Sequence, residues 1–316
     1  MRSFLSRHRD VSAIAVLIVL VVFFAIFARG FMNPSNLQAV LTVVAVTACM
    51  AIGQNLVILS GEIDVSLGSI LALSGFAAGF VALSTGSFFA TVGTAIAVGA
   101  AAGLVNGLLI AFTPVPSIVV TLGTLYGFQG VALLIANSRN IVGVPTGAVL
   151  LGAGSTFVIP NSIWTLAILF VLVGIVRRNT RWGRDLVALG DNPGAARTMG
   201  VPIRRVLITT FILAGALAGI ASIVYIGQLG GMQTSVINNN IILQVIAAVA
   251  IGGTSINGGK GTDAAPVLGA VITGVVSSGI VIMGVPGTWT PLVYGVCLLL
   301  AVARDRFTRS GVARVA

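Results

Sequence analysis

Long stretches with almost no charge limit what this chain can fold into more than any other feature of its sequence. Residues 30–176 contain three charged side chains, and residues 206–303 contain two. These five are Glu62, Asp64, Arg139, Lys260 and Asp263. With 57% hydrophobic residues in a chain of 316, the apolar runs recur too often to be buried in one soluble core. The expected solvent is therefore lipid.

The apolar runs have the lengths of membrane-crossing helices. Crossing the hydrocarbon layer takes about 20 apolar residues, and ten runs approach this length, of which the sixth and eighth are short. They lie at Val11–Ala28, Leu37–Leu59, Leu67–Ser84, Phe88–Phe112, Ser117–Ala136, Ile163–Val176, Val206–Gln228, Ile241–Gly252, Ala264–Met283 and Thr288–Ala303. The runs are apolar on every face, whereas the strands of a membrane barrel alternate. The sequence predicts an all-α membrane protein, a polytopic bundle of about ten transmembrane helices that forms one domain over residues 1–316.

The positions of the basic residues predict the orientation of this bundle. With ten crossings, 15 of the 17 Lys and Arg residues fall on one side, whereas Arg29 and Arg139 fall on the other. Basic residues collect on the cytoplasmic side of membrane proteins, so both termini are expected in the cytoplasm. The same rule accounts for the net charge of +10. Membrane lipid is therefore an expected partner, and nucleic acid is not.

Glycines one helical turn apart predict close packing between helices. The chain has 40 glycines, and the stripe Gly99, Gly103 and Gly107 is expected to face another helix. Pairs with the same spacing occur at Gly75/Gly79, Gly123/Gly127 and Gly215/Gly219.

The densest charge lies in residues 177–205, which contain nine charged side chains. Within this segment Asn192 is a good N-cap, Pro193 suits the first helical position, and Gly200 suits the position just past a last turn. The sequence therefore predicts a short helix at Pro193–Met199.

This predicted helix has the features of a docking element. Ala195 and Ala196 keep its surface low, and Arg184, Asp185 and two later arginines surround it with charge. A short helix of this kind fits a groove of a partner protein. The alternative is an ordinary arginine-rich anchoring loop, which explains the charges but not the caps.

No pattern typical of an enzyme occurs. Lys260 follows a glycine, but Thr254 and Gly261 stand where a phosphate-binding loop requires a glycine and a hydroxyl. A zinc H-E-x-x-H pattern and a serine nucleophile elbow are absent from the sequence. Cys49 and Cys297 are expected to be buried apolar side chains rather than a disulfide or metal pair. No catalytic residue, metal or cofactor is therefore expected.

Glu62 and Asp64 are the candidates for an ion site. An ion-driven carrier needs an ionisable group at membrane depth to take up its coupling ion. The favoured interpretation is instead a carboxylate pair in a short inner loop, with Asp64 as the cap of the helix that begins near Leu67. The bundle would then need an external source of energy. The alternative is a secondary carrier or channel that uses Glu62 and Asp64.

Polar residues inside the apolar runs are candidates for a translocation path. The stretches Ile52–Gly75 and Ile251–Gly274 are interrupted by glycine and polar residues in a similar way, which is typical of transport paths built from repeats. Neutral polar side chains are costly when they face lipid, so they should point inward. Together with Asp64 these are Gln54, Asn55, Asn106, Gln129, Gln228 and Gln244. They suit a neutral, hydroxyl-rich solute, and hydrogen bonding between helices is the alternative role.

Four segments, in order along the chain, resemble one family. Residues 183–201 match G-x-x-x-x-A-x-G-x-N-x-x-A-A-x-x-x-G-[IV], which is similar to the coupling segment of permease subunits of ATP-binding-cassette importers in the ribose, xylose and autoinducer-2 group. Residues 61–75 (GEIDVSLGSILALSG), 106–135 and 247–261 (AAVAIGGTSINGGKG) resemble three further segments of that family. Glu62 replaces a family glycine, and the sequence after Gly261 lacks the family's usual G-T.

The resemblance implies an importer subunit for a sugar or sugar-like solute in a bacterial cytoplasmic membrane. Its implied partners are a cytoplasmic ATPase, an external solute-binding protein and a second permease copy or paralogue. The residues implied for ATPase coupling are Gly190, Asp191, Asn192, Ala195, Ala196 and Gly200. A branched-chain amino-acid permease of the same superfamily is the nearer alternative, although residues 61–69 and 251–261 look more like the sugar group.

Overall fold

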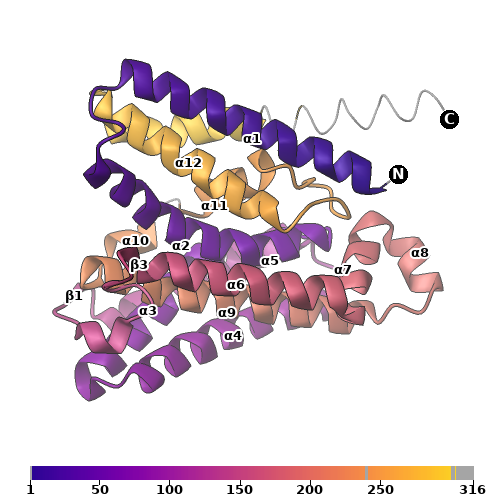
Figure 1. Cartoon of the computed structure of the whole chain (residues 1–316). Helices are drawn as coiled ribbons and strands as arrows, with labels where there is room; N and C mark the ends of the chain where they lie inside the picture. Colours follow the sequence, from indigo (N-terminus) through magenta and orange to yellow (C-terminus); the bar gives the residue numbers. More distant parts are fainter. Residues whose placement is uncertain (1, 239–240, 300–302, 304–316) are drawn as a thin grey trace.

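The computed structural model describes residues 2–238, 241–299 and 303, which form a bundle of helices (Figure 1). Seven of the described helices are long and apolar enough to cross a membrane. They are α2 (Pro34–Leu59), α3 (Leu67–Thr85), α4 (Phe88–Phe112), α5 (Ser117–Ala136), α6 (Asn161–Asn179), α9 (Ile203–Leu229) and α12 (Ala264–Ile282). The predicted all-α membrane bundle is confirmed.

Three shorter apolar helices correspond to the first, eighth and tenth predicted spans. They are Val11–Phe27 within α1 (Arg2–Phe27), α11 (Ile241–Ile251), and Gly287–Leu299, which begins with the 3₁₀ turn η2 (Gly287–Trp289). The 11 residues of α11 make a helix of about 16 Å, roughly half of the hydrocarbon thickness. The eighth predicted span, Ile241–Gly252, is thus a helix of nearly the predicted bounds, and it is short, as the sequence indicates. By contrast, α6 has 19 residues and is longer than predicted.

Short strands and turns lie at the end of the bundle away from α7 (Arg181–Asp191) and α8 (Pro193–Thr198) (Figure 1). β1 (Ile141–Val142) pairs antiparallel with β4 (Gly231–Met232), and β2 (Ser155–Thr156) pairs antiparallel with β3 (Ile159–Pro160). The 3₁₀ turn η1 (Thr146–Val149) lies between β1 and β2, and the single turn α10 (Ser235–Asn238) follows β4.

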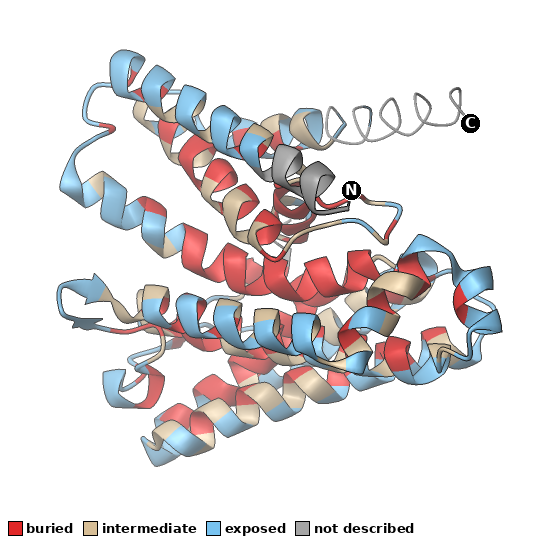
Figure 2. Cartoon of the chain, turned by 45° about the vertical axis from the view of Figure 1, so that its right-hand side comes forward, coloured by how far each residue is buried: buried red, intermediate tan, exposed pale blue. Residues whose placement is uncertain are grey.

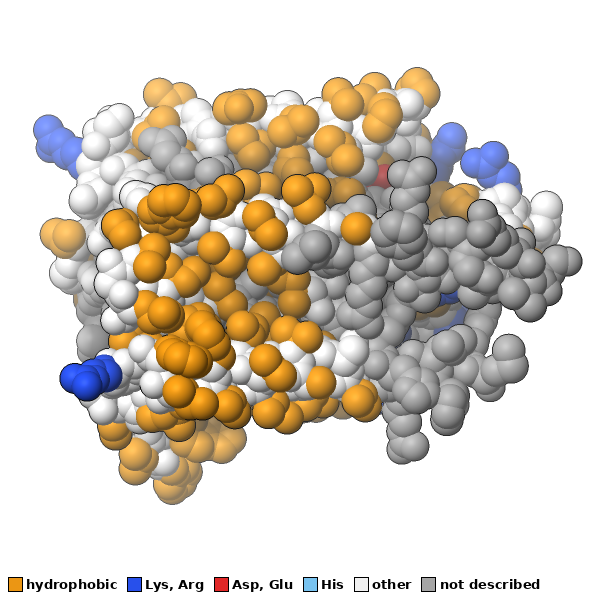
Figure 3. Space-filling view, turned by 90° about the horizontal axis from the view of Figure 1, so that it is seen from above, with side chains coloured by type: hydrophobic (Ala, Val, Ile, Leu, Met, Phe, Trp, Pro, Cys, Tyr) orange, Lys and Arg blue, Asp and Glu red, His pale blue; other side chains and the backbone are white. Residues whose placement is uncertain are grey.

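The helix α2 is the centre of the bundle. It contacts α6, α7, α9, α11 and α12, and all of its residues from Val44 to Leu59 are buried. Figure 2 shows this buried stretch between helices whose outer faces are exposed. Hydrophobic side chains are spread over much of the coloured part of the face seen in Figure 3. This arrangement suits a protein whose outer surface meets lipid.

Among the described helices, α4 and α9 make the most extensive contact. A Cβ placed on Gly99 would lie 2.2 Å from the carbonyl oxygen of Gly215, and one placed on Gly103 would lie 2.1 Å from that of Phe211. The predicted glycine stripe therefore faces another helix, as expected. Gly123 and Gly127 have no atom of the described chain within 4 Å of an added Cβ, so close packing within this chain is a wrong prediction for that pair.

We expect the substitution Gly103→Ala to lower the stability of the folded chain. The added methyl group would collide with backbone atoms of α9, and overpacking of this kind costs about 1–3 kcal/mol. Thermal unfolding of the purified protein in detergent measures the effect. The matched control is Gly93→Ala on the same helix, where an added Cβ meets nothing within 4 Å. Equal melting temperatures for the two variants would contradict the close contact.

Candidate coupling site and solute path

The charged segment 177–205 folds into two helices where the sequence predicts one. The additional helix is α7, and its N-terminus is capped by Thr180, whose hydroxyl accepts a hydrogen bond from the Gly183 amide at 3.2 Å. Gly183 lies so close to the end of α6 that an added Cβ would lie 1.8 Å from the carbonyl oxygen of Arg177. The first turn of α7 is thus in direct contact with the last turn of α6.

The predicted short helix is present as α8, and its caps are those the sequence predicts. The side chain of Asn192 accepts a hydrogen bond from the Ala195 amide at 3.0 Å, and Pro193 is the first helical residue. Gly200 follows with a φ of +75°, a conformation that glycine adopts readily. The helix ends at Thr198, one residue before the predicted end.

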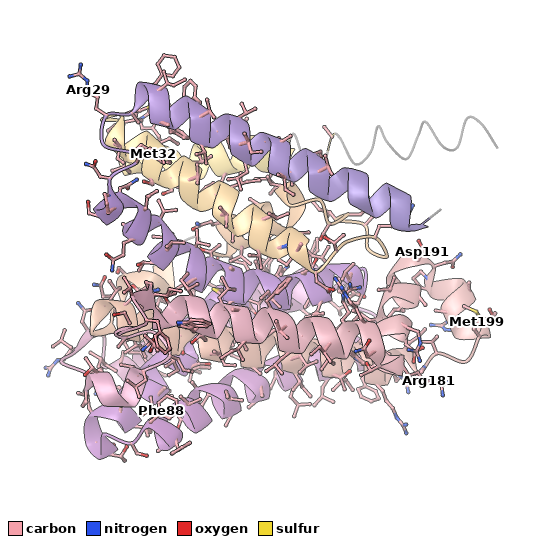
Figure 4. All side chains as sticks on the ribbon, viewed as in Figure 1. Arg29, Met32, Phe88, Arg181, Asp191 and Met199 are labelled. Carbon is pink, nitrogen blue, oxygen red and sulfur yellow. The ribbon has the colours of Figure 1, made fainter. Side chains whose placement is uncertain are left out.

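The two central alanines of α8 face opposite ways. Ala195 is exposed, whereas Ala196 is fully buried inside the loop. The prediction that both leave a low outer surface is therefore wrong for Ala196. Figure 4 shows Asp191 and Met199 at the same end of the bundle as Arg181, far from Arg29 and Phe88 at the other end. A partner that reaches this end meets Ala195 and Met199.

A groove of about 510 Å³ separates α7, α8 and the end of α6. Arg177 and Arg184 line one part of it, and Val187, Ala195 and Met199 contribute apolar surface. The lining of the groove thus combines arginines, the acidic Asp191 and apolar side chains, beside the exposed Ala195 of α8.

Gly190 joins α7 to the central helix by direct backbone contact. An added Cβ on Gly190 would lie 2.0 Å from the carbonyl oxygen of Leu59 and 2.7 Å from the amide nitrogen of Gly259. Asp191 follows immediately and touches Gly259. Two of the predicted coupling residues therefore lie against the end of α2 and against the loop between α11 and α12.

An ion pair that the sequence analysis does not single out ties α6 to α12. The Asp263 carboxylate accepts hydrogen bonds from the guanidinium groups of Arg177 and Arg178, with the Nη2 of Arg177 at 2.8 Å. Asp263 is 7% exposed and Arg177 is 14% exposed. The sequence feature that could have indicated this ion pair is the position of Asp263, an isolated carboxylate on the side of the bundle that contains most of the basic residues.

Asp64 is fully buried in the loop between α2 and α3. It accepts hydrogen bonds from the Ser66 amide at 2.7 Å, the Ser66 hydroxyl at 2.6 Å and the Asn106 side chain at 3.4 Å. The N-cap of α3 is Ser66, so the prediction that Asp64 itself caps this helix is wrong. Burial raises the pKa of the Asp64 carboxyl above its usual value, and its three donors oppose that rise. Burial likewise raises the pKa of Glu62, against a hydrogen bond with Ser117.

Two of the predicted path residues are in contact, since the Asn106 side chain donates to Asp64. Several of the path residues form hydrogen bonds between helices, which is the alternative that the sequence left open. Gln228 donates to the Thr42 carbonyl at 2.9 Å, and Gln129 donates to the Ile237 carbonyl at 2.8 Å. Asn55 links α2 to the loop before α12, and Asn106 holds Asp64 and Ser66.

Two path residues differ from these. Both amide atoms of Gln54 are buried without a hydrogen-bond partner, and so is the amide nitrogen of Gln244. A buried amide without a partner is destabilising. Among the described path residues, Gln54, Gln244 and the amide oxygen of Asn106 therefore have unused capacity to bind a polar solute.

No group of three or more side chains that could hold a metal occurs in the described part of the chain. Cys49 is buried, Cys297 is half-buried, and both are free thiols.

Residues 36–302 match the family described as branched-chain amino acid transport system / permease component. The chain belongs to this family. Its members are transport subunits rather than enzymes, and the chain is a multi-pass membrane protein with apolar helices to match. Against solved structures, the chain resembles PsaBC from Streptococcus pneumoniae in complex with Fab, with a TM-score of 0.50 at 16% identity over 88% of this chain and 94% of that one. That likeness concerns the fold alone.

Curated relatives of this permease match nearly its whole length. The ribose import permease protein RbsC of Escherichia coli (strain K12) is 34% identical, over 96% of this chain and 95% of the relative. The L-arabinose ABC transporter permease protein AraH of Azospirillum brasilense is 33% identical, over 92% and 88%. The autoinducer 2 import system permease protein LsrC of Yersinia pseudotuberculosis is 31% identical, over 99% and 89%.

We expect Gln54→Met and Gln228→Met to separate the two classes of polar residue. Gln54→Met removes a buried amide without partners, so the melting temperature should stay equal or rise, while solute uptake falls. Gln228→Met removes the hydrogen bond to Thr42 and should lower stability by about 1 kcal/mol. Thermal unfolding and uptake are measured on the same preparations. A destabilised Gln54→Met variant with normal uptake would contradict the assignment.

Proposed function

We propose that this permease moves a sugar or sugar-like neutral solute across the bacterial cytoplasmic membrane, as the membrane-spanning subunit of an ATP-binding-cassette importer. The relatives named for ribose, L-arabinose and autoinducer 2 support this substrate class over the branched-chain amino-acid alternative. The amide of Gln54 and the amide nitrogen of Gln244, which are buried without a partner in the described part of the chain, are neutral groups of the kind that bind hydroxyls.

The observation that carries the proposal is the exposed, capped helix α8 beside a groove. In the proposed mechanism a cytoplasmic ATPase binds the face that contains Asp191, Asn192 and Ala195. Ala196 and Gly200 hold the shape of α8, and Gly190 connects α7 to the central helix. ATP-driven movement of the ATPase then moves α7 and α8 against the bundle.

The remaining parts of the importer follow from the same proposal. Residues 1–316 act as one transmembrane permease domain. The end of the bundle with α7 and α8 is rich in arginine, so it faces the cytoplasm, and both termini lie on that same side. An external solute-binding protein delivers solute at the opposite end, which contains Arg29 and Phe88 (Figure 4). A second permease copy or a paralogue completes the membrane part, and lipid surrounds it.

We expect Ala195→Glu to weaken binding of the ATPase without unfolding the permease. Burying an unpaired charge in the interface costs at least about 2 kcal/mol, or about 30-fold in affinity. Co-purification of the ATPase from membranes in mild detergent measures this, together with uptake in cells.

The matched control is Ser155→Glu, which places the same charge at an exposed position at the other end of the molecule. Ala196→Glu is not a substitute, because Ala196 is buried and its loss would disturb α8 itself. Full co-purification and uptake with Ala195→Glu would exclude α8 as the docking helix.

We expect uptake of a neutral sugar to depend on ATP and not on an ion gradient. Vesicles that contain the complete importer are tested with ribose, L-arabinose and leucine, with ATP plus an uncoupler or with a gradient and no ATP. Uptake with ATP in the presence of the uncoupler is the expected result, and Asp64→Asn should not change this dependence.

Two other results would each replace the proposal. Uptake that collapses with the gradient but survives loss of ATP would make Glu62 and Asp64 an ion site. Uptake of leucine in preference to both sugars would support the branched-chain amino-acid alternative.

A further inference from the structure

The loop between α11 and α12, residues 252–263, is enclosed by three parts of the chain that are distant in sequence. One is the end of α2, another is the end of α7, and the third is the end of α6. The loop therefore lies where the proposed ATPase-binding helices meet the membrane bundle.

Backbone contacts hold the middle of this loop. The Gly259 amide donates a hydrogen bond to the Leu59 carbonyl at 3.1 Å. An added Cβ on Gly259 would lie 2.5 Å from the Cα of Asp191, and one on Gly258 would lie 2.7 Å from the Cα of Gly61. No side chain separates these segments. A displacement of α7 therefore moves the backbone of the loop directly and is not absorbed by rotation of a side chain.

The end of the loop is held by charge. Asp263 receives both Arg177 and Arg178 from the last turn of α6, immediately before α7 begins. Arg177 and Asp263 are both largely buried. Removing one partner of a buried ion pair leaves the other charge buried without compensation, which is strongly destabilising. The pair therefore holds the end of the loop against α6.

Side chains of α2 fix the rest of the loop. Asn55 accepts a hydrogen bond from the Thr254 hydroxyl at 2.7 Å and donates to the Thr262 carbonyl at 3.2 Å. At the first residue of the loop, an added Cβ on Gly252 would lie 1.8 Å from the carbonyl oxygen of Ala265 in α12. The start of α12 is thus in contact with the end of α11, and the two helices and their loop form one unit.

We propose that residues 252–263 are the relay through which movement of α7 and α8 reaches the membrane bundle, and that Asp263 is the positioning residue of this relay. The relay rests on the proposed docking of the ATPase at α8. Its contacts with Leu59 and Gly61 carry the movement to the break between α2 and α3, and its own ends carry it to α11 and α12. Both interrupted stretches of the chain therefore respond together.

The experiment uses the complete importer in proteoliposomes and measures the ratio of solute transported to ATP hydrolysed. We expect Asp263→Asn and Arg177→Gln each to lower this ratio roughly tenfold, within the range typical of coupling between sites, while the ATPase stays bound. The double variant should be no worse than Asp263→Asn alone, because that substitution already removes the pairing of residue 263 with both Arg177 and Arg178. Arg139→Gln, at an exposed position at the other end, is the control.

A second pair of variants tests the backbone contact independently. Gly259 and Gly284 both have positive φ values, +70° and +80°, but an added Cβ meets Asp191 at the first and nothing within 4 Å at the second. Gly259→Ala should lower the transport ratio, and Gly284→Ala should not.

The outcomes separate the relay from the proposed function. Uptake and hydrolysis that fall in proportion, or an unchanged ratio in the variants that assemble, would overturn the relay while leaving ATP-driven import intact. An unaltered importer that binds no ATPase would remove the proposed function itself, and with it the relay.

Discussion

Close approach of helix backbones, which glycine permits, is the constraint on which the rest of this structure depends. Lipid does not drive apolar helices together, so packing contacts must do so. Between α4 and α9 the stripe that contains Gly103 meets the backbone of the other helix directly. Outside the bundle, Gly190 and Gly259 bring α7 to the end of α2 in the same way. Close backbone contact at glycines thus holds the bundle together and also connects it to the charged loop.

The sequence predicted the features that follow from local chemistry. Apolar run length gave the fold class, and Asn192 with Gly200 gave both ends of α8. It did not predict α7, whose glycines lower helix propensity and are explained only by contacts with α6 and α2. It placed Ala196 on the outer surface, which is wrong, because a six-residue helix has too few turns to show which face is buried. Contacts between distant segments, such as Asp263 with Arg177, leave no local pattern at all.

Polarity inside the membrane turns out to have two roles that composition alone does not separate. Gln129 and Gln228 each donate to a carbonyl group of another segment, so they hold the bundle together. Gln54 occupies the most enclosed helix and has no such partner. A buried amide that is costly in this conformation is of use to a transporter only if another state or a solute satisfies it. The distinction depends on hydrogen bonds and not on residue type.

The enclosure of α2 has a consequence for how the chain is made. Its residues 44–59 are surrounded largely by helices that follow much later in the sequence, and the partner of Asn55 is Thr254, 199 residues away. When α2 first enters the membrane, none of those neighbours has been synthesised. Its polar residues must then be accommodated by lipid headgroups, water or the insertion machinery until α9, α11 and α12 arrive. During synthesis, the helix that ends up at the centre of the protein is therefore at first exposed to its surroundings.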